Sequence, residues 1–372
     1  MKICLLKESR VVDDRRVAFS PRQLAELQKQ FPNHTFAVQA SENRCFSDAS
    51  YKAEGIKTVD QASDFDILIG IKEVASDHLF PGKIYFFFSH TIKQQKHNQA
   101  MLQEILRKNI SLYDYELLTN EKGKRILGFG KWAGIVGAWY AVRMYFKKYK
   151  NESHPSAMEF ESYQSLIDYY KELDIADFKV LIAGSGNVGD GALEFLSNHP
   201  EMSILSPSEY INAKNKGVCQ LGSEELFINK DGGKFNKMDF YKNPSEFKNI
   251  CKKYFHVTHV FINAIFWKED IARHFDLNEL PDHVPELIAD ISCDKNGAIP
   301  LTTEYTTSEN PYLSFNKLGQ KVDLDKAYFS IMAVPNLPNE LAKSASEDFG
   351  NSFKNILSNF LNNPNSEMLN RA

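Results

Sequence analysis

Short apolar runs alternate with amphipathic stretches along this chain, a pattern that predicts strands alternating with helices. Several runs are apolar throughout, as strands buried on both faces of a parallel sheet are. In the first third, the predicted strands are 2–6, 35–39, 67–71, 85–88 and 111–114, and the predicted helices are 21–31 and 96–108. After a long helix predicted at 133–149, the strands are 179–183, 203–205, 259–265 and 287–291, and the helices are 187–196 and 340–359. The pattern predicts an α/β fold with parallel sheets.

A glycine-rich turn follows the strand predicted at 179–183 and opens the helix predicted at 187–196. It reads GSGNVG and carries glycines at the three positions of a dinucleotide-binding fingerprint. Such glycines allow a tight turn, let the backbone approach a pyrophosphate, and let the helix pack on the strand, while the helix N-terminus faces the phosphates. We therefore predict dinucleotide binding here; a glycine-rich packing turn is the alternative. The predicted contacts are Gly184, Ser185, Gly186, Asn187, Val188 and Gly189.

The ribose of the dinucleotide is expected near the end of the second strand of this unit, where NAD sites usually carry Asp or Glu. The strand predicted at 203–205 ends instead at Ser206, and Glu209 lies slightly further on. Without an acid at that point, the 2′-phosphate of NADP would meet no repulsion. We therefore favour NADP over NAD, with Ser206 as a contact, unless Glu209 reaches the ribose by another backbone path.

The glycine-rich turn begins at residue 184, and about 130 residues before the long predicted helix have their own strand–helix alternation. A stretch of that length is enough for a separate domain. We expect two Rossmann-like domains: a catalytic domain of residues 1–130 plus 338–372, and a dinucleotide-binding domain of residues 131–337. The active site is expected in the cleft between them.

Polar side chains follow three predicted strands of the first domain: Lys72, His90 and Glu116. Because the carboxyl ends of parallel strands lie on one edge of a sheet, we expect these groups to converge. A lysine and a histidine near a carboxylate can share the proton transfers of a reaction. Arg16 and Arg125 are candidates for binding a carboxylate substrate, whose geometry a guanidinium matches. Taken singly, each residue is an ordinary polar group, so the expected convergence carries the prediction.

Composition narrows the class of protein. The 372 residues carry a net charge of −4, which gives no basic surface for nucleic acid. The five cysteines form no CxxC, and no Cys/His pair has metal-ligand spacing, so we expect free thiols and no metal site. No apolar stretch reaches the ~18 residues that a membrane span needs. We expect a cytoplasmic protein with no membrane or nucleic-acid partner.

A set of motifs then resembles a known family. The motifs are RRVAFSP, GIKEV, KIYFFFSHTIKQQ, DYE, GFGKWAGIVGA, AGSGNVGDGA, FINAIFW and ADISCDKNGAIPLTTEYTT. In this order they resemble the alanine dehydrogenase and saccharopine dehydrogenase superfamily. The resemblance is strongest to the lysine-forming saccharopine dehydrogenases and the lysine-ketoglutarate reductase domain of bifunctional aminoadipic semialdehyde synthases. It implies a nicotinamide-dependent enzyme that interconverts L-lysine plus 2-oxoglutarate with saccharopine by imine reduction.

The resemblance also implies roles for residues. Lys72 and His90 match the catalytic lysine and histidine of the family, and Arg16 matches its carboxylate-binding arginine. Glu116 matches an acidic group near the catalytic lysine and is the third predicted catalytic residue. The remaining substrate-binding positions are Glu73, Lys93 and Arg125. The loops expected to face the nicotinamide side carry Asn263, Asp290 and Asn336. The serine-rich strand end resembles the reductase branch, which again implies NADP.

Two alternatives remain at this point. The stretch AVPNLP resembles the alanine dehydrogenase branch, which favours amination of a small 2-oxo acid with ammonia. A nucleotide-binding redox sensor, or a transhydrogenase-type subunit without turnover of its own, is the other. Because the sequence stops at residue 372, we expect a stand-alone enzyme without the saccharopine-cleaving half of the bifunctional relatives. An oligomer is possible in either case.

Overall fold

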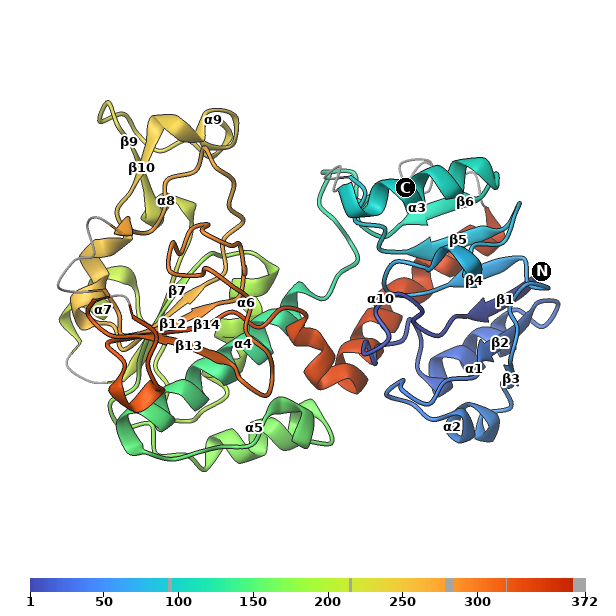
Figure 1. Ribbon diagram of the computed structural model, residues 1–372, viewed down its shortest axis with the longest axis horizontal. Coiled ribbons are helices and arrows are strands. Elements are labelled where there is room, and N and C mark those ends of the chain that lie inside the picture. The colour runs from blue at the N-terminus through green and yellow to red at the C-terminus, as the bar shows by residue number, and fades with distance from the viewer. Residues whose placement is uncertain (93–95, 214–215, 278–283, 319, 364–372) are drawn as a thin grey trace. The chain divides into compact units, whose positions relative to one another are not determined.

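The computed structural model describes residues 1–92, 96–213, 216–277, 284–318 and 320–363. The chain forms two compact units: unit 1 consists of Met1–Phe129 and Ala342–Ala372, and unit 2 of Gly130–Leu341. Each unit is built around a sheet with helices packed against it (Figure 1). Among the described residues, no helix is both long and apolar enough to cross a membrane.

Unit 1 contains a six-stranded, fully parallel sheet in the order β3-β2-β1-β4-β5-β6. Its strands are β1 (Lys2–Leu5), β2 (Thr35–Gln39), β3 (Lys57–Val59), β4 (Ile67–Ile69), β5 (Ile84–Phe87) and β6 (Ser111–Asp114). Its helices are α1 (Pro21–Gln30), α2 (Asp48–Ala53), η1 (Ser76–His78), α3 (Lys96–Arg107) and α10 (Ala342–Asn362). The strand order reverses between β1 and β4, which makes that point of the carboxyl edge the expected ligand crevice.

The aromatic run of β5 is buried on both faces of this sheet. Tyr85 and Phe87 belong to a core cluster that also contains Met101 of α3. On the other face, the Phe86 ring lies 5.6 Å from that of Phe353 in α10, centroid to centroid. Because successive side chains of a strand point to opposite faces, one run of aromatics anchors β5 between two layers of helix. The strand end, where the chain becomes polar, is thereby held firmly.

Unit 2 contains a second six-stranded sheet, in the order β13-β14-β12-β11-β7-β8, which is parallel except for β13. Its strands are β7 (Lys179–Ala183), β8 (Gly217–Leu221), β11 (Val260–Asn263), β12 (Leu287–Asp290), β13 (Tyr312–Phe315) and β14 (Phe329–Met332). A separate antiparallel pair joins β9 (Phe227–Asn229) to β10 (Phe247–Asn249). Here the strand order reverses between β7 and β11.

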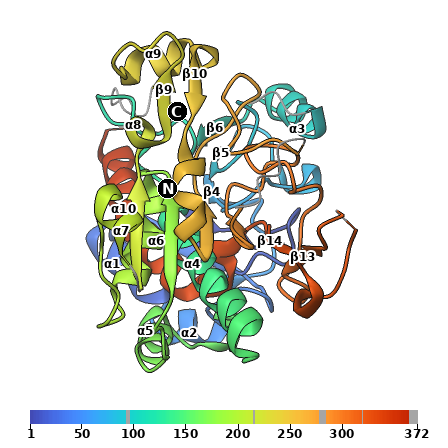
Figure 2. The same cartoon turned by 90° about the vertical axis from the view of Figure 1, so that its left-hand side faces the viewer.

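The helices of unit 2 are α4 (Gly130–Tyr145), η2 (Phe146–Lys150), η3 (Ala157–Glu159), α5 (Tyr163–Lys171), α6 (Asn187–Ser197), α7 (Pro207–Asn212), α8 (Ser223–Leu226), α9 (Lys237–Lys242), η4 (Pro244–Glu246), η5 (Cys251–Val257), η7 (Leu324–Lys326) and η8 (Leu337–Leu341). Helix α4 packs along α6, and the β9–β10 pair lies with α8 and α9 at one end of the unit (Figures 1 and 2). The predicted α/β fold with two Rossmann-like sheets is confirmed.

The prediction of a sheet strand at 203–205 is wrong. Only an isolated bridge joins Ile204 to Val218, and Ser206 with Pro207 then starts α7. The strand beside β7 is β8, whose residues Gly217–Leu221 lie in a stretch that is polar and lysine-rich overall. The reason is burial: Val218, Cys219 and Leu221 supply the fully buried positions that a strand beside β7 requires.

Candidate functional site

Glu8 and Lys72 meet at the point where the strand order of unit 1 reverses. The Glu8 carboxylate accepts two backbone hydrogen bonds of 2.8 Å, from the N–H of Ile71 and the N–H of Lys72. This contact fixes the chain just after β4. Burial raises the pKa of Glu8 to about 8, the nearby Asp14 charge adds to the rise, and the two N–H groups oppose it.

The Lys72 side chain is half-buried at this edge. Burial lowers the pKa of its ammonium, and the Arg16 cation acts in the same direction, while the carboxylates of Asp14, Glu73 and Glu8 act against them. A lowered pKa gives Lys72 a larger neutral fraction near neutral pH than a solvated lysine has. That fraction is what a proton acceptor needs.

His90 follows β5 in a left-handed backbone conformation, with φ of 49°. Its Nδ1 lies 2.8 Å from Oε1 of Glu73, which follows β4. Asn98 of α3 donates to the same carboxylate oxygen at 3.3 Å and to the backbone oxygen of Ser89 at 3.1 Å. Burial would raise the pKa of Glu73, but its hydrogen bond with His90 and the nearby cations lower it to about 2. The ring is thus held by an ionised carboxylate, with Nε2 turned away from Glu73.

The carboxylate of Glu116 follows β6, and Asp114 holds the backbone there. Asp114, the last residue of β6, accepts a short hydrogen bond from Ser89 Oγ and one of 2.9 Å from the N–H of Glu116. Oε1 of Glu116 lies 3.5 Å from Nη1 of Arg125. Its Oε2 is buried and has no hydrogen-bond partner among the described residues. A buried carboxylate oxygen without a partner is costly and calls for a donor.

Arg16 is bound differently from what we predicted. Its Nε and Nη2 donate to the two carboxylate oxygens of Asp14 at 2.9 and 2.6 Å, and both side chains are almost fully buried. Its guanidinium also lies over the Phe129 ring, 4.2 Å from the centroid. Asp14 therefore occupies the Nε–Nη2 edge of the guanidinium, and binding of a substrate carboxylate by Arg16 stays a prediction. The pair lines one wall of a cavity of about 620 Å³ in unit 1, which Glu8 also lines.

The structure thus brings Glu73 and His90 into contact, and joins them to Glu116 through Ser89 and Asp114. Glu8, Asp14 and Asn98 were missed from the sequence, and Asp114, which stands in the motif DYE, was given no role. Glu8 could have been found, because it follows β1 as Lys72 follows β4. Asn98 could not, because it reaches the site from a helix. Lys93 lies outside the described residues.

The glycine-rich turn of unit 2 has the geometry that a pyrophosphate requires. Gly184 has φ of 116°, and a Cβ there would lie 2.6 Å from the oxygen of Ala264. A Cβ at Gly189 would lie 1.9 Å from the oxygen of Gly184, so a larger residue would force the helix off the strand. A Cβ at Gly186 would meet no atom within 4 Å, which leaves open space at the N-terminus of α6. Ser185, Gly186 and Asn187 are exposed there, while Val188 is partly buried.

Ser206 does not lie at the end of the strand beside β7, which corrects the prediction. It caps the N-terminus of α7, where its N–H and hydroxyl donate to Glu209 at 2.8 and 2.6 Å. The strand beside β7 is β8, and its carboxyl end leads into Gly222, Ser223 and Glu224. Glu224 is exposed, so an acid does follow the second strand of this unit.

Asn263 and Asp290, predicted to face the nicotinamide, are each 1% exposed. Asn263 Nδ2 donates to Asp290 Oδ1 at 2.8 Å, and the Thr302 hydroxyl donates to Asp290 Oδ2 at 2.6 Å. Burial raises the pKa of Asp290 to about 6, although both hydrogen bonds lower it. These side chains therefore tie the ends of β11 and β12 together inside the unit. Asn336, after β14, is partly exposed in a left-handed conformation with φ of 60°.

Comparison with known proteins identifies relatives. Residues 4–136 match the family model for the N-terminal domain of alanine dehydrogenase/PNT. The chain is 29% identical over 396 residues to alpha-aminoadipic semialdehyde synthase of Arabidopsis thaliana, covering 94% of this chain and 37% of that protein. It is 25% identical over 358 residues to saccharopine dehydrogenase (NAD(+), L-lysine-forming) of Neurospora crassa, covering 90% of this chain and 85% of that protein. The chain spans less than half the length of the semialdehyde synthases that it matches.

Solved structures agree at the level of the fold. The chain superposes on an L-alanine dehydrogenase with a TM-score of 0.67 and 14% identity, covering 100% of this chain and 94% of the other. It superposes on a transhydrogenase from Sinorhizobium meliloti with a TM-score of 0.63 and 12% identity, covering 100% of this chain and 97% of the other. Identities this low speak for the fold alone. Together with the sequence relatives, they confirm the resemblance to the superfamily of alanine dehydrogenase and lysine-forming saccharopine dehydrogenase that the motifs indicate.

Proposed function

We propose that this protein is a nicotinamide-dependent oxidoreductase that interconverts L-lysine plus 2-oxoglutarate with saccharopine. The observation that carries the proposal is the Glu73–His90 pair, with its 2.8 Å contact, on the same sheet edge as the half-buried Lys72. The names of the relatives support the choice of substrates, since they are aminoadipic semialdehyde synthases and lysine-forming saccharopine dehydrogenases. An alanine-dehydrogenase-like amination shares only the fold-level likeness.

The reaction needs several proton transfers. The ε-amine of lysine attacks the 2-oxo carbon of 2-oxoglutarate, water leaves, and the resulting imine carbon accepts a hydride to give a secondary amine. We assign the transfers to Lys72, whose pKa is lowered by burial, and to Nε2 of His90. Glu73 holds the imidazole in one orientation through its contact with Nδ1.

Glu116 and Arg125 suit the charged groups of the substrates. The unpartnered Oε2 of Glu116 can accept from the incoming amine, which would satisfy its missing hydrogen bond. Arg125 is largely exposed beside it and can bind a carboxylate in a bidentate manner. For Arg16, bound to Asp14, we propose a supporting role that keeps a positive charge beside Lys72.

The residues of the glycine-rich turn fit a nicotinamide dinucleotide, which supplies and receives the hydride when bound. The open space at Gly186 and the N-terminus of α6 suit its pyrophosphate. We now propose NAD in place of NADP, because the strand beside β7 is followed by Glu224, which can accept from a ribose 2′-hydroxyl and would repel a 2′-phosphate. The name of the Neurospora crassa relative, which includes NAD(+), supports that choice.

The proposal is tested by following cofactor oxidation at 340 nm with purified protein. Lysine plus 2-oxoglutarate should oxidise NADH, and NADPH more slowly. Pyruvate plus ammonia is the comparison: turnover with that pair alone would point to the alanine-dehydrogenase-like alternative. A His90→Gln variant separates an enzyme from a sensor, because it should bind NADH normally and lose turnover. No oxidation with any substrate pair would sink the proposal.

A further inference from the structure

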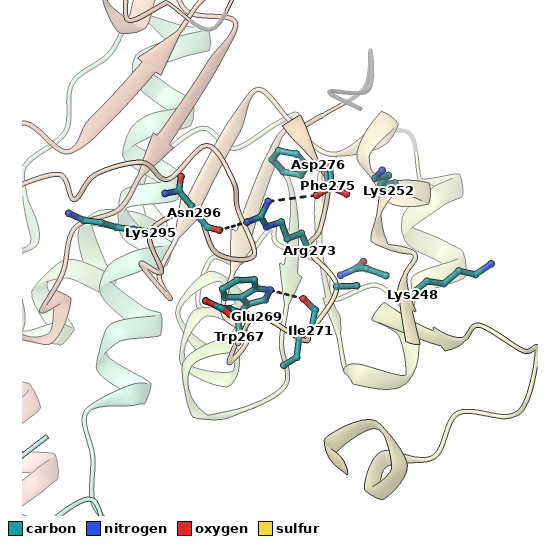
Figure 3. Close-up of a pocket in the computed structure, with 12 residues that line it drawn as sticks. Lys248, Lys252, Trp267, Glu269, Ile271, Arg273, Phe275, Asp276, Lys295 and Asn296 are labelled. Atoms are coloured by element: carbon teal, nitrogen blue, oxygen red, sulfur yellow. Dashed lines mark hydrogen bonds and ion pairs between the residues drawn. The ribbon is translucent and has the colours of Figure 1, made fainter. Parts of the chain in front are cut away.

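A cavity of about 840 Å³ opens in unit 2 (Figure 3). Three segments line it: 248–252 from β10 and the start of η5, 267–276 after β11, and 295–296 after β12. Among the described residues, neither the turn at 184–189 nor the end of β8 at 222–225 contributes to its lining. The cavity is therefore a separate site on the same unit.

Positive charge predominates around this cavity. Its ionisable lining groups are Lys248, Lys252, Arg273 and Lys295 against Glu269 and Asp276, which leaves a formal excess of two positive charges. Figure 3 shows Lys295 on one side of the cavity, Lys248 and Lys252 on the other, and Arg273 between them. Cations placed around one hollow raise the local concentration of anions. The ligand class is therefore anionic.

An aromatic ring stands beside these cations in a fixed position. The indole Nε1 of Trp267 donates to the backbone oxygen of Ile271 at 2.9 Å, and the ring is partly buried. The Arg273 guanidinium lies 5.9 Å from the Trp267 ring centroid and donates to the backbone oxygen of Asn296 at 2.8 Å. Arg273 thus joins the loops after β11 and β12. A fixed indole beside cations is an arrangement on which a base can stack while its phosphate is neutralised.

The floor of the cavity is connected to the sheet by hydrogen bonds. Asn249 is one of the lining residues, and its Nδ2 lies 3.1 Å from Nδ1 of the buried His274. His274 Nε2 lies 3.0 Å from Oδ1 of Asn263, the last residue of β11, and Asn263 in turn bonds to Asp290 at the end of β12. These contacts fix Asn249, and with it one part of the cavity lining, to the ends of β11 and β12.

We propose that this cavity binds a nucleoside phosphate, with its base against Trp267 and its phosphates among Lys248, Arg273 and the neighbouring cations. The site is distinct from the dinucleotide site and does not depend on the reaction proposed above.

The test is calorimetric titration of ADP into protein saturated with NAD+, so that the glycine-rich turn is filled. We expect one further site. Lys248→Glu should weaken ADP and inorganic phosphate about tenfold or more, whereas Lys242→Glu, at an exposed position outside the cavity, should change little. Trp267→Ala should weaken ADP and adenosine about tenfold and leave phosphate unchanged, and Trp267→Phe should retain ADP binding.

ADP that produces no heat in the NAD+-saturated protein, or that binds Lys248→Glu and Trp267→Ala as tightly as it binds the wild type, would overturn the proposal. Should the protein fail to bind NAD+, the function proposed above fails but this one does not. ADP binding must then still be lost in Lys248→Glu and survive in a Gly186→Val variant of the turn. Circular dichroism of each variant checks that the unit is folded.

Discussion

Nδ1 of His90 lies 2.8 Å from Oε1 of Glu73, and the two residues follow the paired strands β5 and β4. His90 has φ of 49°, a conformation that is uncommon for residues other than glycine and that persists where the surroundings enforce it. The surroundings are visible: Asn98 binds the same carboxylate oxygen and the backbone oxygens of Ser89 and His90. The structure thus orients one imidazole at considerable local cost, as a proton-transferring histidine needs.

Replacing Glu73 by glutamine should lower kcat/KM by about 10-fold or more, because a correctly positioned acid–base group contributes roughly 10²–10⁴-fold and Glu73 positions His90. Glutamine can keep a hydrogen bond at Nδ1, but its amide cannot reproduce both contacts of the Glu73 carboxylate oxygen, with His90 and with Asn98, unless the amide oxygen takes that position. Binding of NADH should be unchanged. Steady-state kinetics and a cofactor titration measure both effects, with Glu54→Gln at an exposed position of unit 1 as the control. Equal activity of the two variants would show that Glu73 does not position His90 for the reaction.

Glu8 should make stability depend on pH. Its pKa is raised from 4.5 to about 8 in the folded chain, so between these values the folded state holds a proton that the unfolded chain has released. Stability from this group is full below pH 4.5, falls as pH rises towards about 8, and then levels off, with a slope of at most about 1.4 kcal/mol per pH unit. Glu8→Gln cannot ionise, so the free energy of unfolding of the wild type minus that of the variant should decline across this window. Urea denaturation at a series of pH values measures the difference, and a flat difference would contradict it.

Asp14 should matter for stability through Arg16. Both side chains are buried, and Asp14→Asn leaves a buried guanidinium without its counter-charge, which typically costs about 3–5 kcal/mol. The exposed pair Arg22 and Glu26 is the control, and Arg22→Gln, which removes only that pair, should cost less than about 1 kcal/mol. Denaturant unfolding of the two variants compares these costs. Similar values for both would show that Arg16 does not rely on Asp14.

Glu224 should decide between the two nicotinamide cofactors. Glu224→Gln removes the charge that would repel a 2′-phosphate and weakens the bond to a 2′-hydroxyl, so the ratio of kcat/KM for NADH over NADPH should fall about tenfold or more. Glu209→Gln removes an acid that is engaged with Ser206 and should leave the ratio unchanged. Kinetics with both cofactors measure the ratio. A change in the Glu209 variant, with none in the Glu224 variant, would contradict this assignment and would place Glu209, not Glu224, at the ribose.

Periodicity in the sequence was sufficient for most of the sheet strands. The apolar run Tyr85 to Phe88 predicts a strand buried on both faces. The structure agrees, because α3 covers one face of β5 and α10 covers the other. The glycine-rich turn was found for a similar reason, since close backbone approach at Gly184 and Gly189 leaves few alternatives to glycine. Local rules succeed where the physical constraint is itself local.

Long-range pairing set the limits of that approach. Strand β8 is short and lies among lysines, so its burial beside β7 shows only in the folded chain, and the ribose position was placed at Ser206 in consequence. The Arg16–Asp14 pair escaped notice because two nearby charges in a sequence give no sign of being buried together. Asn263 and Asp290 end paired strands, and their mutual hydrogen bond, which turns them inward, depends on that pairing.

Isotope tracing tests the central claim most directly. L-lysine labelled with ¹⁵N at the ε-amine is incubated with 2-oxoglutarate, NADH and the purified protein, and the products are analysed by mass spectrometry. Direct condensation and reduction predict that the label appears in saccharopine, in the secondary amine that joins the two substrates. Label found in glutamate, or NADH oxidation without any labelled saccharopine, would contradict the account.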